Sequence, residues 1–116
     1  MNPFKQFGQM ANLLTALPKI KEEMKRLQQR LGQLVAEGDA GAGMVRVRVN
    51  GKLEMLSCSV SEEVFHIHDR EMLEDLIRSA TNQAIERARQ QAAEEAGKMA
   101  ADLGMPAGLG LPGLPS

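Results

Sequence analysis

Residues 38–51, GDAGAGMVRVRVNG, place one alternating strand between two glycine-containing turns, and this stretch constrains the fold more than any other. Three valines point to one side of the strand, while Arg46 and Arg48 point to the other. Asn50-Gly51 is the preferred pair for a type I′ hairpin turn, in which both central residues take positive φ. The stretch therefore predicts two hairpins that share a central strand.

The residues around this stretch complete an antiparallel meander of three strands. We expect strands at about 35–40, 44–50 and 52–60, with a glycine turn at 41–43 between the first two. Gly38, just before this turn, is free to take positive φ. One face of the sheet is apolar, because the alternate residues of the third strand join the valines of the second.

A heptad repeat of apolar residues before the sheet predicts a long helix from Met10 to about 35–37. Its steps alternate between three and four, the a/d spacing of a coiled-coil seam. Pro18 falls inside the repeat, so the helix either starts near it or continues with a kink; the unbroken phase favours the kink. A helix of about 25 residues spans about 37 Å, whereas a strand spans about 20 Å. The excess seam therefore needs a second helix, from this chain or from another copy.

A second long helix is expected from about residue 70 to residue 100 or beyond. Asp69 is a good N-cap, and the residues at 61–68 form a connection from the sheet. The second half of this helix is rich in Ala, Gln and Glu, so it either projects into solvent or packs closely on another helix. After Gly104 the chain is rich in Pro, Gly and Leu.

The sequence thus predicts an α+β fold: long helix, three-stranded antiparallel meander, long helix, in two layers, as a homodimer. We expect a flexible N-terminus at 1–9, a single domain at 10–103 and a disordered tail at 104–116. Helix seams and the apolar sheet face form one continuous core across the dimer. Its candidate residues are Leu17, Ile20, Met24, Leu27, Leu31, Val45, Val47, Val49, Leu56, Cys58, Val60, Leu73, Leu76 and Ile77.

No pattern in the chain indicates an enzyme, a cofactor or a small-molecule substrate. Cys58 falls on the expected core face of the third strand and has no activating His or Asp motif beside it. His66 and His68 lack further ligands at metal-binding spacing, so we expect no metal site. The glycines near residue 41 precede a strand and lack a Gly-Lys-Ser/Thr ending, which excludes a phosphate loop. No segment approaches the roughly 18 apolar residues of a membrane span, and the single cysteine fits a reducing, cytoplasmic compartment.

Charge is distributed unevenly along a chain whose net charge is only −1. Residues 1–37 hold six basic and three acidic side chains, and residues 71–116 hold four basic and seven acidic ones. The first helix is therefore basic and the last is acidic, which points weakly to an anionic ligand at the front end. The basic residues are either an ordinary solvated face or phosphate contacts.

The glycine turn, the alternating strand, Asn50-Gly51 and the segment DREMLEDLI at 69–77 resemble the YbaB/EbfC nucleoid-associated proteins of bacteria. This resemblance covers about residues 10–105. It implies an obligate homodimer with a tweezer-like outline, from which the first and last helices project. It also implies duplex DNA binding in the nucleoid, with broad or weak sequence preference, and effects on nucleoid organisation and gene expression.

Carried onto this chain, the resemblance implies that DNA is contacted by basic residues of both long helices. The alternative is a protein-interaction module whose projecting Met-, Ala- and Leu-rich helices grip another protein without binding DNA. Salt dependence separates the two, because phosphate contacts weaken steeply with added salt and apolar contacts hardly change. The implied DNA contacts are Lys19, Lys21, Lys25, Arg26, Arg30, Arg78, Arg87 and Arg89.

Overall fold

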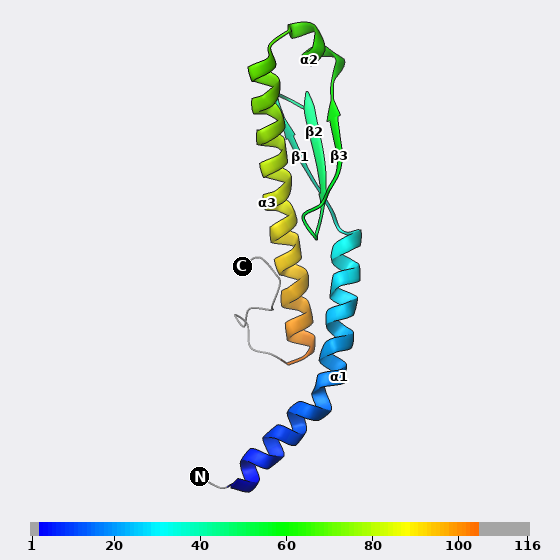
Figure 1. The fold of residues 1–116 in the computed structure, drawn as a ribbon, viewed down its shortest axis with the longest axis vertical. Helices are drawn as coiled ribbons and strands as arrows, with labels where there is room; N and C mark the ends of the chain where they lie inside the picture. Colours follow the sequence, from blue (N-terminus) through cyan, green and yellow to red (C-terminus); the bar gives the residue numbers. More distant parts are fainter. Residues whose placement is uncertain (1–2, 105–116) are drawn as a thin grey trace.

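The chain folds as an elongated α+β structure, 75 Å along its longest axis, in which one long helix runs along a small sheet and another extends from the end of the sheet (Figure 1). A computed structural model describes residues 3–104, with side chains from residue 14 onward. The expected tail lies outside the described residues except for Gly104. The elements in chain order are α1 (Pro3–Gln33), β1 (Val35–Ala40), β2 (Val45–Asn50), β3 (Met55–Val60), α2 (Glu62–Ile67) and α3 (Arg70–Asp102).

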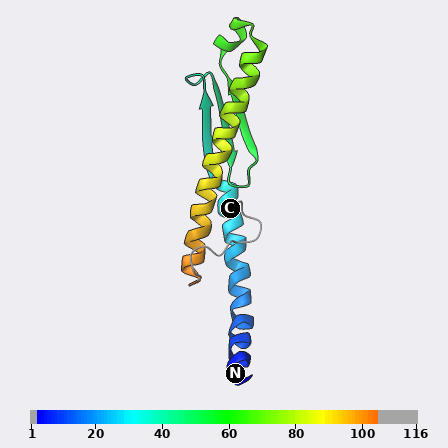
Figure 2. The same ribbon diagram turned by 90° about the vertical axis from the view of Figure 1, so that its left-hand side faces the viewer.

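The sheet is the predicted antiparallel meander, in the order β1-β2-β3. Helix α3 crosses one face and packs on β1 and β2, but it hardly reaches β3 (Figure 2). Helix α3 has a row of alanines, one at every fourth position, that faces this sheet and continues beyond its end. Because alanine is small, the helix approaches the backbone of the strands closely. These alanines are fully buried, together with three valines of β2. They are Ala80, Ala84, Ala88 and Ala92, with Val45, Val47 and Val49.

Gly38 does not use the positive φ that a glycine allows; it serves a packing contact instead. Its φ is not positive, whereas Gly41 and Gly43 in the following turn have φ of 63° and 86°. Gly38 is buried directly beneath α3, and a Cβ added to it would overlap the backbone of Ala80 and Ala84. The glycine is what allows α3 to lie on β1.

The second hairpin also differs from the sequence prediction. Its loop is longer than a two-residue type I′ turn, β3 begins only at Met55, and the positive φ falls at Leu53 rather than at Gly51. The buried Asn50 organises this loop: its Oδ1 accepts hydrogen bonds from the backbone N–H groups of Lys52 and Glu54, both at 3.0 Å. Gly51 instead contacts α1, and its N–H donates to the Leu31 carbonyl at 2.8 Å.

Helix α1 is longer than predicted, since it begins at Pro3, includes residues expected to be flexible, and ends at Gln33. It bends near its middle, where Pro18 lies (Figure 1), as expected for a proline that removes a backbone hydrogen bond and clashes with the preceding turn. Beyond the bend, Leu27 and Leu31 are buried in a second cluster against Ala92 and Met99 of α3. The heptad seam therefore finds part of its partner helix within the same chain.

The connection between β3 and α3 contains a short helix that the sequence did not predict, α2. It ends at Ile67, and the C-cap residue His68, with a φ of 56°, terminates it. The next residue, Asp69, is the N-cap of α3 as predicted: its side chain accepts a hydrogen bond from the Met72 N–H at 3.0 Å.

Three predicted core residues are exposed in the single chain. Leu17 lies on α1 beyond the end of α3, with 46% of its surface accessible. Leu56 and Cys58 lie on β3, on which α3 does not pack. Cys58 is paired with the buried Val47, so its side of the sheet is the predicted one, but nothing within the described chain covers it.

Candidate nucleic-acid interface

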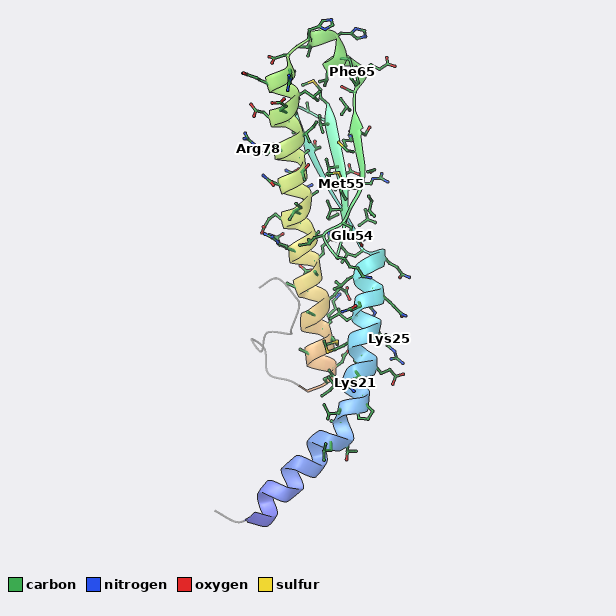
Figure 3. The ribbon with its side chains drawn as sticks, in the orientation of Figure 1. Lys21, Lys25, Glu54, Met55, Phe65 and Arg78 are labelled. Carbon is green, nitrogen blue, oxygen red and sulfur yellow. The ribbon has the colours of Figure 1, made fainter. Side chains whose placement is uncertain are left out.

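The predicted DNA contacts lie at several places along the molecule rather than in one patch. Five are on α1 and three on α3. Figure 3 shows Lys25 on the side of α1 that faces away from α3 and Lys21 farther along the same helix, whereas Arg78 points outward from the far side of α3, near the opposite end of the molecule. One copy of the chain therefore does not bring all of these residues to one concave surface.

Half of the predicted contacts already have partners within the chain. Arg26 bonds to Glu23 at 3.0 Å and lies 3.4 Å from Glu22. The other three are Arg30 with Glu95 at 3.8 Å, Arg78 with Asp75 at 3.1 Å, and Arg87 with the Glu37 carbonyl oxygen at 2.7 Å. Exposed ion pairs contribute only about 0–1 kcal/mol, but the carboxylates offset the positive potential at Arg26, Arg30 and Arg78. The carbonyl that holds Arg87 is neutral.

The lysines of α1 are different. Lys19, Lys21 and Lys25 are exposed and form no ion pair within residues 14–104, and Arg89 on α3 shares this property. Lys21 and Lys25 are four residues apart, so their side chains lie on the same face of the helix, one turn from each other. They place two exposed cations without an ion-pair partner on one face of α1.

A third lysine, Lys52, extends this face and was missed by the sequence prediction. It lies in the β2–β3 loop, which Gly51 holds against the end of α1. Its Cε is 3.5 Å from the position that a Cβ on Gly32 would occupy. Because Gly32 is two helical turns after Lys25, Lys52 continues the line of Lys21 and Lys25. We call these three residues the lysine row; no local sequence pattern links Lys52 to the other two.

Two further arginines lie on the open face of the sheet, away from α3. Arg46 and Arg48 share one carboxylate, that of Glu37, at 3.8 and 3.2 Å. Their side of the sheet was predicted correctly from the alternation of the strand. The shared partner leaves one net positive charge in this group of three residues.

Comparison with known proteins identifies the family. The sequence pattern of the YbaB/EbfC DNA-binding family matches residues 6–103. This chain belongs to that family. It is 41% identical over 103 residues to a nucleoid-associated protein of Syntrophobacter fumaroxidans, across 89% of this chain and 93% of the relative. It is 38% identical to a nucleoid-associated protein of Bacillus thuringiensis, across 88% of this chain and 94% of the relative.

The fold is also found in a solved structure. The crystal structure of an uncharacterized protein from Helicobacter pylori matches with a TM-score of 0.66 and 24% identity, over 80% of this chain and 95% of that one. The predicted family resemblance and the helix, three-stranded sheet, helix architecture are therefore confirmed.

Relative to what a DNA-binding member of the YbaB/EbfC family needs, the distal part of α3 is electrostatically unfavourable. Glu95 lies between Arg30, at 3.8 Å, and Lys98, at 3.6 Å, so one carboxylate offsets two cations. Glu94 and Asp102 are exposed nearby in the sequence. The lysine row, on α1 and the β2–β3 loop, is thus the more favourable surface for an anionic partner.

The described residues offer little for other chemistry. Within residues 3–104, no three His, Cys, Asp or Glu side chains are grouped so that they could hold a metal ion. No helix in this range is long and apolar enough to cross a membrane.

Proposed function

We propose that this chain is a non-enzymatic, nucleoid-associated protein that binds duplex DNA as a tweezer-like homodimer with weak or broad sequence preference. Membership of the YbaB/EbfC DNA-binding family supports DNA as the partner. The structural observation that best supports the proposal is the lysine row, a line of exposed cations without acidic partners. Binding of this kind would act on nucleoid organisation and gene expression.

The chemistry of the row favours phosphate contact over base recognition. A lysine ammonium binds phosphate as a point charge, and such contacts position a protein on the duplex without reading its sequence. The chain has no Trp or Tyr and only three Phe, so it offers few aromatic side chains for stacking on bases. Broad sequence preference follows.

The proposed dimer is supported by an apolar surface that the single chain leaves uncovered. It consists of residues at the start and in the middle of β3 and in the following α2; Figure 3 shows Met55 and Phe65 on this side of the molecule. Large apolar side chains clustered along an edge strand are typical of interaction surfaces. We call it the β3–α2 surface: Met55, Leu56, Cys58, Phe65 and Ile67, all exposed.

A second copy is the occupant that we propose for the β3–α2 surface. Pairing there lies near the sheet end of the molecule and leaves the other end, where α1 extends past α3, free in both copies (Figure 1). Two free arms are the arrangement that a tweezer-like dimer requires. The lysine row of each copy would then be available to the DNA held between or across the arms.

Replacing Leu56 by Glu should convert the dimer largely to monomer. A carboxylate would be forced into an apolar interface twice, once from each copy, and we expect the dissociation constant of the dimer to rise on the order of 100-fold. Sedimentation equilibrium over a range of protein concentrations measures it. Val35→Glu is the matched control, because Val35 is equally exposed at 51% but lies on β1. A Leu56→Glu variant as dimeric as the Val35→Glu variant would contradict the proposed interface.

Salt-dependent DNA binding tests the function itself. We expect the purified protein to bind a random duplex of about 40 base pairs at 50 mM salt. Its affinity should fall sharply at 200 mM, because the release of counterions from the DNA is less favourable when the salt concentration in solution is higher. Fluorescence anisotropy with several unrelated sequences measures affinity and preference together. No binding at micromolar protein in low salt would favour the alternative, a protein-interaction module that has kept the fold without a DNA surface.

A further inference from the structure

The first half of α1 has an unusual amino-acid composition for a helix that projects from the fold. Residues 6–18 contain no charged side chain, although Lys5 precedes them and Lys19 follows. Leu14 and Leu17 on this segment have 65% and 46% of their surface accessible. Solvated helices normally carry charged residues on their exposed side, and apolar stripes normally face a packing partner. Leu14 and Leu17 are therefore exposed apolar side chains in a segment whose uncharged composition is typical of a covered helix.

The partner of α1 ends where this segment begins. Helix α3 ends at Asp102, and Leu103 packs against the cluster formed by Leu27 of α1 and Met99 of α3. The bend near Pro18 turns the first half of α1 toward the side of α3, so that it passes below the C-terminal end of that helix (Figure 1). Chain that leaves α3 at this point starts beside the uncovered stripe.

The sequence that follows has the matching chemistry and sufficient length. Residues 105–116, MPAGLGLPGLPS, contain three leucines and three prolines and no charged residue. Twelve residues in an extended polyproline-like conformation span about 37 Å, whereas the helix from Pro3 to Pro18 spans about 24 Å. The prolines and glycines prevent this segment from extending α3, and the prolines lower the entropy lost when it is ordered.

We propose that residues 105–116 pack in an extended conformation along the uncharged stripe of α1 in the same chain. Leu109, Leu111 and Leu114 take the place that α3 occupies farther along the seam, and they cover Leu14 and Leu17. The packed segment carries no charge and leaves the lysine row open. The proposal stands on the apolar stripe, the end of α3 and the length of the segment, and it does not depend on DNA binding.

Amide hydrogen exchange on the full-length protein tests the contact. In a Leu109→Ser/Leu111→Ser/Leu114→Ser variant, the amides of residues 14–17 should exchange on the order of ten times faster than in the unmodified protein, because the cover of the helix is lost. Amides of β2 should be unchanged. The control variant Ala107→Ser/Gly108→Ser/Gly110→Ser also introduces three serines but keeps the leucines, and it should exchange as the unmodified protein does. Equal exchange at residues 14–17 in all three proteins would overturn the proposal.

A spin label distinguishes the same chain from the partner copy as the source of the segment. A nitroxide is attached at residue 116 in a Cys58→Ser/Ser116→Cys background. Resonances of Leu14 and Leu17 should broaden when the isotope-labelled chain carries its own nitroxide. They should remain sharp when isotope-labelled chains without nitroxide are mixed with unlabelled chains that carry it. Broadening in the mixed sample would show that the segment packs on the partner, and it would overturn the assignment to the same chain.

Discussion

Gly38→Ala is expected to destabilise the protein by about 3 kcal/mol or more. The added Cβ would overlap the Ala80 carbonyl oxygen and the Ala84 backbone nitrogen. Neither group can move by a side-chain rotation, so α3 must lift from β1 and open a void among the buried valines of β2. Urea denaturation at a fixed protein concentration measures the loss, and the concentration must be held constant because dimerisation contributes to the apparent stability.

The control for this prediction is a second glycine in a different environment. Gly97 lies inside α3, and a Cβ added to it would meet no atom within 4 Å. Gly97→Ala should therefore stabilise the protein by about 0.5–1 kcal/mol, the difference in helix propensity between the two residues. If Gly38→Ala unfolded at the same urea concentration as the unmodified protein, this result would contradict the claim that α3 packs too closely on β1 to admit a Cβ at residue 38.

The features of the fold that local chemistry determines were predictable from the sequence. The alternation of valine and arginine predicted both the position of β2 and which face of the sheet is buried. The N-cap at Asp69 gave the start of α3, because a carboxylate that bonds a free N–H of the first turn is favourable in any context. The heptad spacing gave α1 on both sides of Pro18. Each of these patterns needs only neighbours in the sequence.

What sequence reasoning missed depends on contacts between distant segments. Gly38 and Gly51 look like turn residues, yet one makes room for α3 and the other for the end of α1. Leu56 and Cys58 alternate as core residues do, but α3 is wide enough to cover only two of the three strands. Amphipathic patterning shows that a face is to be covered; it does not show whether the cover comes from the same chain.

The candidate site was predictable only as a set of charges. The sequence shows that α1 is basic, but it does not show that Arg30 meets the Glu95 carboxylate of α3. Lys52 is remote from Lys25 in the sequence and joins it through the packing of Gly51 on Leu31. Tertiary structure therefore divides equal-looking cations into compensated and uncompensated ones, and this division is the basis of the last prediction.

Neutralising two members of the lysine row should remove most of the DNA affinity. In a Lys21→Gln/Lys25→Gln variant, a dimer loses four phosphate contacts if both arms bind, and we expect the dissociation constant at 50 mM salt to rise on the order of 100-fold. The slope of log affinity against log salt should decrease by about 1 for each lysine that contacts a phosphate, hence by about 2 for one arm and about 4 for two. Anisotropy titrations at a series of salt concentrations measure both quantities.

The control must separate local contact from net charge. Arg70→Glu changes the charge of each chain by the same −2, but Arg70 lies at the start of α3, at the opposite end of the molecule from the arm of α1 (Figure 1), where its contact is Glu74. Charges separated by more than about 10 Å are largely screened at 0.1 M salt. Arg70→Glu should therefore weaken binding only slightly and leave the salt slope unchanged. If both variants lost affinity equally, DNA would be attracted by the overall charge of the dimer, and the lysine row would not be its contact surface.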